Sequence, residues 1–259
     1  MKSNSETGNW KTLSAFEQLI VIITALGTAY NPSQTLIKLA TLLAQYATGK
    51  AAMDTYFAKN TTYNNATNTR EIAFAAVKLL CTRILGGFES SGAKEQTVKD
   101  LKHYIRKIRG QRAGSNKPSD DETAKTASPD AATNDSTTND ESAKSHSAAQ
   151  LSYDSIIEHF ANIIEILLAE STYSPNESDL KVTALQATLA DLKAKNTAVI
   201  SAYTNLTNAR INRDKVLYAE GTGIVDVAKE AKYYIKSIYG AQSPQYKQVT
   251  KLIFRKPSK

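Results

Sequence analysis

The chain has few of the residues that build reactive centres and covalent cross-links. Its 259 residues include one cysteine, three histidines, two methionines and one tryptophan. The single cysteine, Cys81, excludes an intramolecular disulfide and a cysteine-based metal site. It lies in the apolar run VKLLCTRIL, where we expect a small buried core residue. A lone cysteine is also compatible with a reducing compartment.

Motifs for metal, nucleotide and acid–base chemistry are missing as well. The histidines His103, His146 and His159 do not pair at metal-ligand spacing, and His159 with Glu165 fits no zinc motif. No glycine-rich phosphate loop is present, and Gly221-Thr222-Gly223 is better explained as a helix break. We therefore predict no catalytic residues, no metal, no cofactor and no small-molecule substrate, and hence a protein that is not an enzyme.

Long hydrophobic runs are scarce. The longest stretch, Leu19 to Leu26, is much shorter than the roughly 20 apolar residues that span a bilayer. It starts late and carries no small-residue cleavage site, which is atypical of a signal peptide. We predict a cytoplasmic protein without a signal peptide or membrane span, while secretion by a route without such a signal stays open.

Proline and glycine are also sparse, with six and 11 residues, whereas alanine, leucine, threonine and lysine are plentiful. Apolar residues recur at spacings of three and four, which predicts an all-α fold. The expected helices cover 13–30, 34–60, 71–85 and 95–108 in the first half, and 152–173, 177–203, 224–239 and 245–254 in the second. The stretches KNTTYNNATNTR and YTNLTNARINRD are rich in Asn and Thr, and predict either a break or a helix that continues with a polar seam.

The two halves of the chain share a pattern. Residues 30–74 align without a gap to residues 173–217 at an offset of 143, with 12 identities in 45 positions. The matches include Pro32 with Pro175 and Arg70 with Arg213, which we expect to be equivalent structural residues. Further along, VKLLCTRILGG aligns with AKYYIKSIYGA only at an offset of 154, so the second half holds about 11 extra residues. The pattern predicts a tandem duplication of one helical module.

This duplication predicts the domain organisation. We expect two antiparallel bundles of about four helices, one over residues 11–112 and one over 150–259. Residues 113–149 between them consist of Ser, Thr, Asp, Asn, Ala and Lys with almost nothing apolar. Such a composition cannot offset its ordering entropy by burial, so we predict a disordered acidic tether.

Three further sequence features stand out, namely Tyr173-Ser174-Pro175, the stretch from Asn208 to Asp214, and the stretch from Ile235 to Val249. Taken together, they are similar to those of two-repeat bacterial helical proteins with no assigned activity. This resemblance implies an all-helical architecture and no catalytic residues. The first module lacks the SPQYKQV ending, so its last helix lies outside the pattern.

The charge distribution gives the clearest candidate contact surface. The net charge is +7, and each module ends in a basic stretch while the tether is acidic. The candidate residues are Lys99, Lys102, Arg106 and Arg109 in the first module, and Lys232, Lys236, Lys247 and Lys251 in the second. The first four share one helical face, and the second four are accompanied by tyrosines. Such faces could bind phosphate backbones, be merely solvated, or be covered by the tether.

Two functional hypotheses follow. The first is a non-enzymatic structural, adaptor or assembly protein that binds other proteins, or itself, through duplicated helical bundles, including coiled-coil-like packing. The alternative is a sequence-nonspecific nucleic-acid-binding protein that uses the basic ends. The identity of a partner, the oligomeric state, the packing of the bundles and the role of the tether do not follow from the sequence.

Overall fold

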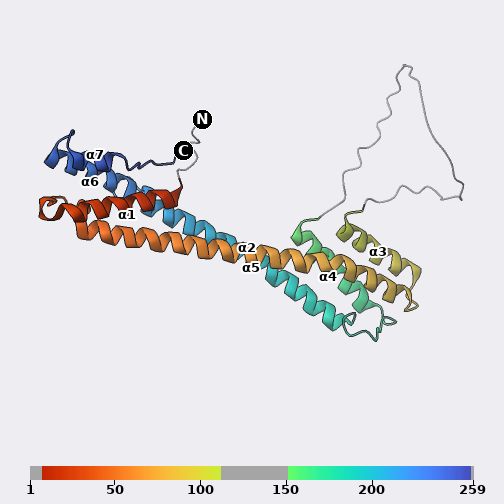
Figure 1. Cartoon of the computed structure of the whole chain (residues 1–259). Helices are drawn as coiled ribbons and strands as arrows, with labels where there is room; N and C mark the ends of the chain where they lie inside the picture. The colour runs from red at the N-terminus through yellow and green to blue at the C-terminus, as the bar shows by residue number, and fades with distance from the viewer. Residues whose placement is uncertain (1–7, 112–150, 258–259) are drawn as a thin grey trace, which may run out of the picture. The chain divides into compact units, whose positions relative to one another are not determined.

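The computed structural model describes residues 8–111 and 151–257 and is helical (Figure 1). The α-helices are α1 (Asn9–Leu26), α2 (Leu39–Glu89), α3 (Glu95–Arg109), α4 (Tyr153–Ala169), α5 (Val182–Tyr218), α6 (Ile224–Tyr239) and α7 (Pro244–Thr250). Two short 3₁₀ turns, η1 (Gly27–Ala29) and η2 (Thr35–Ile37), connect α1 to α2. No strand occurs in these described ranges, which confirms the all-α class. The predicted tether at 113–149 lies outside the described residues.

The two apolar helices α1 and α4 begin each half. Phe16, Leu19 and Ile23 of α1 are buried, as are Phe160 and Ile163 of α4. The first turn of α4 is capped because the Ser152 hydroxyl accepts a hydrogen bond from the backbone N–H of Ser155 at 3.1 Å. The spacing of apolar residues by three and four positions therefore predicts both helices.

The Asn- and Thr-rich stretches do not interrupt the helices that contain them. α2 runs for 51 residues through Asn60–Thr69, and α5 runs for 37 residues to Tyr218. The second alternative from the sequence, a helix that continues with a polar seam, is the one observed. The halves differ beyond this point, because α2 continues to Glu89 whereas a loop over 219–223 separates α5 from α6.

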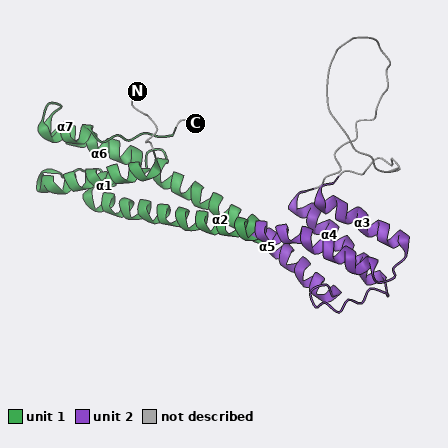
Figure 2. Ribbon diagram, turned by 45° about the vertical axis from the view of Figure 1, so that its right-hand side comes forward, with its two compact units in different colours: residues 1–69, 197–259 green, residues 70–196 purple. Residues whose placement is uncertain are grey.

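The chain forms two compact units, and each draws on both halves of the sequence (Figure 2). Unit 1 contains residues 1–69 and 197–259, and unit 2 contains residues 70–196. The units therefore do not coincide with the domains expected at 11–112 and 150–259. The reason is the continuity of α2 and α5, since each helix contributes its first part to one unit and its last part to the other.

The core of unit 1 joins α1 and part of α2 to the end of α5, α6 and α7. Leu13, Phe16 and Ile23 belong to the same buried cluster as Ile224 and Val249. α2 approaches α1 and α6 at Gly49, where an added Cβ would lie 2.8 Å from the Cδ1 atoms of both Leu13 and Ile224. A side chain at this position would occupy the space that these two residues fill.

The core of unit 2 joins the last part of α2 and α3 to α4 and the start of α5. α2 supplies residues at alternating spacings of three and four: Phe74, Val77, Cys81, Ile84 and Phe88. α3 packs along α4 through the buried side chains of Leu101, Ile105 and Ile108. Cys81 is buried in this cluster, in agreement with the expectation of a core residue.

Candidate interaction sites

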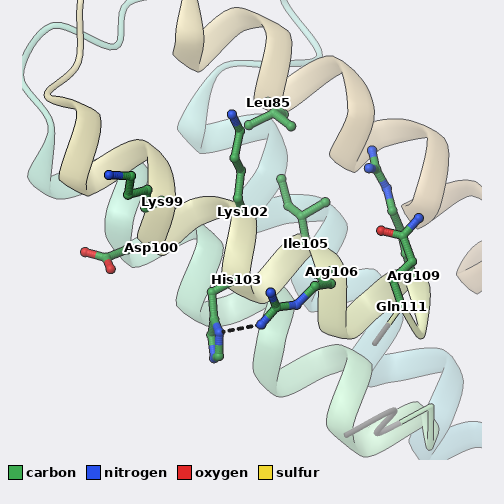
Figure 3. Close-up of a pocket in the computed structure, with 9 residues that line it drawn as sticks. All are labelled: Leu85, Lys99, Asp100, Lys102, His103, Ile105, Arg106, Arg109 and Gln111. Carbon is green, nitrogen blue, oxygen red and sulfur yellow. Dashed lines mark hydrogen bonds between the residues drawn. The ribbon is translucent and has the colours of Figure 1, made fainter. Parts of the chain in front are cut away.

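The basic face predicted over residues 99–109 lies on α3 and borders a cleft of about 790 Å³ in unit 2 (Figure 3). α3 ends at Gly110, whose left-handed backbone conformation, with φ of 71°, lets its N–H bond back to the carbonyls of Arg106 and Lys107. The cleft lining is mostly charged and comprises Leu85, Lys99, Asp100, Lys102, His103, Ile105, Arg106, Arg109 and Gln111. The structure thus brings the four predicted residues of this face to one cleft.

Carboxylates partly neutralise this face. Lys99 Nζ lies 2.8 Å from Glu95 Oε1, one turn earlier on α3. Lys102 Nζ lies 2.7 Å from Glu89 Oε1 at the end of α2. The two lysines therefore carry less unbalanced charge than the sequence suggests, although exposed ion pairs of this kind are weak and exchangeable.

The two arginines of this face have neutral partners. Arg109 donates a hydrogen bond from Nη2 to the Thr82 hydroxyl at 2.8 Å. Arg106 Nη2 lies 3.3 Å from His103 Nδ1, and nearby Lys107 and Arg106, together with burial as the largest cause, lower the pKa of His103. His103 therefore favours its neutral form beside the guanidinium. Of the four basic residues of the cleft, Arg106 and Arg109 thus have no carboxylate partner among the described residues, while Asp100 adds one negative charge to the lining.

The second basic set lies in unit 1 and has a different arrangement. Lys232 donates a hydrogen bond to the Leu252 carbonyl at 2.8 Å, and burial lowers the pKa of this lysine. Lys236 Nζ lies 5.9 Å from the centre of the Tyr246 ring. Lys247 and Lys251 are exposed on and just after α7. Lys232 thus contacts the segment after α7, whereas Lys236, Lys247 and Lys251 are exposed.

The residues after α7 explain why Lys232 is engaged. The helix expected at 245–254 ends at Thr250, and the chain continues without regular structure to Pro257. Phe254 is buried, and Lys256 Nζ lies 2.5 Å from Asp226 Oδ2 at the start of α6. This ion pair lowers the pKa of Asp226. The segment 251–257 is therefore fixed along α6.

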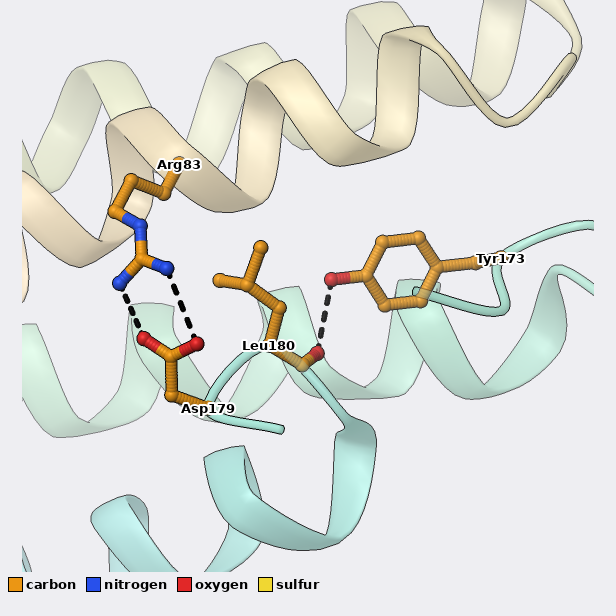
Figure 4. Close-up of polar contacts among 4 residues, drawn as sticks. All are labelled: Arg83, Tyr173, Asp179 and Leu180. Carbon is orange, nitrogen blue, oxygen red and sulfur yellow. Dashed lines mark hydrogen bonds and ion pairs between the residues drawn. The ribbon is translucent and has the colours of Figure 1, made fainter. Parts of the chain in front are cut away.

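The two Tyr-x-Pro turns make the same hydrogen bond in both units. The Tyr30 hydroxyl donates to the Ile37 carbonyl at 2.7 Å, and the Tyr173 hydroxyl donates to the Leu180 carbonyl at 3.0 Å (Figure 4). All four residues are buried, and burial raises the pKa of both tyrosines. Pro32 and Pro175 lie within these turns at positions related by the same offset. Their role is structural, because the proline ring fixes the backbone conformation of the turn.

Arg70 binds the start of α4. Its guanidinium carbon lies 3.8 Å from the centre of the Tyr153 ring, and Nη1 donates to Asn196 Oδ1 at 3.1 Å. Asn196 is buried and in turn donates from Nδ2 to Asp154 Oδ1 at 2.8 Å. Arg70 from the first half of the chain thereby contacts the apolar helix of the second half.

Arg213 occupies the corresponding place in unit 1. Its Nε lies 2.9 Å from the side-chain amide of Asn9, the first residue of α1, and that amide lies 2.6 Å from the Tyr218 hydroxyl. Arg213 also pairs with Asp214 at 2.7 Å and lies over the Tyr56 ring. Arg213 from the second half thus contacts the apolar helix of the first half.

His159, which fits no metal motif in the sequence, is a buried polar residue in the structure. It is 3% exposed, and neither ring nitrogen has a hydrogen-bond partner in the described structure. Its ring centre lies 6.0 Å from that of Tyr104 on α3. Burial, followed by the charge of Lys107, lowers its pKa. Helical periodicity places His159 on the buried face of α4, but only tertiary structure shows that it has no partner.

Two observations concern reactive groups. Burial raises the pKa of the Cys81 thiol to about 12, so this sulfur is protonated at neutral pH. In residues 8–111 and 151–257, no group of three or more His, Cys, Asp and Glu side chains could hold a metal ion. The described clefts therefore offer hydrogen bonds, charge and apolar contacts.

The N-terminal helix passes a test of length and composition for crossing a membrane. The segment concerned is Asn9–Ala29, longer than the run from Leu19 to Leu26 considered from the sequence alone. Core helices of soluble proteins and signal sequences pass the same test. Six residues of α1, including Phe16 and Ile23, are buried in unit 1.

These features define an all-α protein with clefts bordered by charged and polar side chains. No protein-family model, curated protein or solved structure matches the chain.

Proposed function

We propose that the protein is a non-enzymatic adaptor or assembly component that binds other proteins, or further copies of itself, through its helical surfaces. The observation that carries this proposal is an apolar face of α2 in unit 2. Ile72 is 74% exposed and Leu79 is 70% exposed, and a spacing of seven places both on one side of the helix. Ala75 and Ala76, which lie between them, are exposed as well. A continuous apolar stripe of this kind is typical of a surface that docks a partner helix.

Several finer features belong to the same proposal. The chain arose by tandem duplication, and the matched tyrosine bonds and the matched positions of Arg70 and Arg213 support this origin. We also propose that α2 and α5 pack in a coiled-coil-like manner. For the protein as a whole, we propose a cytoplasmic location and a bacterial source. The burial of Phe16 and Ile23 supports a core role for α1.

The test is capture from a cell extract by the tagged full-length chain, with and without nuclease, at low and high salt. Proteins bound through an apolar face should survive both nuclease and high salt, because salt does not weaken apolar contacts. The double variant I72E/L79E should lose them. L168E is the matched control, since Leu168 is 50% exposed on α4 of the same unit. A chain that stays monomeric and retains no specific protein would contradict the proposal.

A second candidate function is nucleic-acid binding, and the α3 cleft favours it. Arg106 and Arg109 border a cleft of about 790 Å³, and their hydrogen bonds go to neutral groups, so both guanidiniums can reach phosphates. Binding should weaken steeply with salt, by about 0.9 in the logarithmic slope for each phosphate contact on duplex DNA.

This second candidate is tested by fluorescence polarisation with labelled duplex DNA and single-stranded RNA over a salt series. R106Q/R109Q should lower the slope on duplex DNA by about 1.8. K247Q/K251Q, which removes two exposed lysines of the second basic set, shows whether that basic end contributes. Binding that is absent at low salt, or that ignores salt, would exclude this function.

A further inference from the structure

Each unit contains a cleft beside its Tyr-x-Pro turn. The cleft in unit 1 has a volume of about 330 Å³ and is lined by Pro32, Ser33, Gln34, Ile37, Glu230, Tyr233, Tyr234 and Ser237. The cleft in unit 2 has a volume of about 640 Å³, and its lining includes Pro175, Asn176, Glu177, Leu180 and Arg83. The turn residues match at the offset of 143, and Arg83 matches Ser237 at the offset of 154. The two clefts therefore lie at equivalent places.

Both clefts are built from both halves of the chain. In unit 1 the turn comes from the first half and the opposite wall from α6. In unit 2 the turn comes from the second half and the opposite wall from the end of α2. Each wall includes the last part of a helix, which is the end where the helix dipole places partial negative charge.

A carboxylate borders each cleft. In unit 1, Glu230 Oε2 accepts a hydrogen bond at 2.7 Å from Nε2 of Gln34, a neutral side chain that brings no opposite charge. In unit 2, Arg83 is engaged by both carboxylate oxygens of Asp179, which neutralises its charge (Figure 4). Glu177 then leaves this cleft with an excess negative charge. Both sites are therefore suited to a cationic group.

An exposed apolar side chain lines the cleft of unit 1, and another lies on α2 one helical turn outside the lining of the cleft of unit 2. Tyr233 is 66% exposed beside Glu230, and Leu79 is 70% exposed one turn before Arg83. The two residues are related by the offset of 154. The Tyr233 ring can accept a cation on its face as well as apolar contact. Hydroxyl groups of Ser90 and Thr172 at the rim of the larger cleft suit the polar backbone of an extended peptide.

From this arrangement we infer that the two clefts are docking sites for a basic segment of a partner protein, in which a Lys or Arg side chain is followed by an apolar residue. The cation faces Glu177 or Glu230, and the apolar residue packs on Leu79 or Tyr233. This inference rests on the proposed protein-binding function and names the chemistry of its partner. One chain offers two such sites, so it can hold two segments at once.

The probes are two pools of acetylated octapeptides with randomised flanks, one with a fixed central Arg-Leu pair and one with Glu-Leu. Full-length protein should be captured by the Arg-Leu pool alone. Titration calorimetry with the best single peptide should give two equivalents per chain. E177K and E230K should each reduce this to one, and E177K/E230K to none. E165K is the matched control, because Glu165 is exposed on α4 away from both clefts, and it should keep two.

Equal capture by the Glu-Leu pool, no capture by either pool, or unchanged stoichiometry in a folded E177K/E230K variant would overturn the inference. Circular dichroism checks the fold of each variant. Failure here is distinguishable from failure of the proposed function. Extract proteins that bind E177K/E230K normally but are lost with I72E/L79E would leave the adaptor function standing without these docking sites.

Discussion

Single residues at the contact between α3 and α4 affect the stability of unit 2. Among them is His159, whose two ring nitrogens are buried without a hydrogen-bond partner in the described part of the chain. It lies on α4 against Tyr104 of α3, with Lys107 and His103 of α3 and Glu158 of its own helix contributing charge nearby. A buried imidazole without hydrogen-bond partners is stable only in its neutral form. Its protonation would therefore oppose the packing of α3 on α4.

This gives a pH prediction. The pKa of His159 is lowered in the folded chain, so below the ordinary value of about 6.5 the unfolded chain binds a proton that the folded chain does not. Stability should therefore fall as pH falls, by at most about 1.4 kcal/mol per pH unit for this one group. Urea unfolding between pH 7.5 and pH 5 measures it.

The matched variants are His159→Leu and His103→Gln. Removing His159 should flatten the acid dependence, while removing the exposed His103 should retain most of it. An equally steep dependence in the His159→Leu variant would show that other groups cause the acid sensitivity.

At the scale of elements, α2 shows how a polar sequence can stay helical. Thr62, Thr67 and Thr69 each donate a hydrogen bond from the hydroxyl to the carbonyl four residues earlier, at 2.9, 3.0 and 2.8 Å. These hydroxyls are thus satisfied along the helix and do not compete for turn conformations. The low intrinsic helix propensity of this stretch is offset by the packing of α2 on both sides of it.

Substitutions at Thr62 test whether α2 is continuous through residues 60–69 or is interrupted there. In a continuous helix, Thr62→Ala should raise stability by up to about 0.7 kcal/mol, because alanine is the better helix former. Thr62→Pro should cost about 3 kcal/mol or more, because proline removes a helical hydrogen bond and clashes with the preceding turn. Thermal unfolding of both variants provides the measurement. A Thr62→Pro variant as stable as the parent chain would show that residues 60–69 are not helical.

Much of the element order could be predicted from apolar periodicity. α6 begins and ends where the pattern predicts, and α1 and α4 are found within a few residues. The basic face of α3 was also predictable, because Lys99, Lys102, Arg106 and Arg109 follow helical spacing. The ion pair of Lys102 with Glu89 was not, since it requires knowing that α2 ends beside α3.

At the scale of the whole molecule, the sequence did not predict that each compact unit contains segments from both halves of the chain. The two halves carry equivalent apolar faces, so packing within a half and packing across halves satisfy the same pattern. Packing across halves is observed because α2 and α5 are continuous. Each of these helices begins in the unit that holds the apolar helix of its own half and ends in the other unit. Arg70 and Arg213 then bind the first turn of the apolar helix from the other half.

The central claim is that each compact unit needs both halves of the chain. Cleavage of the folded protein at a protease site inserted after Asp130, between the two halves, tests it most directly. After complete cleavage, gel filtration in native buffer should show both fragments eluting together at the position of the uncut chain, and separating only in denaturant. Two folded fragments that elute apart in native buffer would contradict the account and restore independent bundles over 11–112 and 150–259.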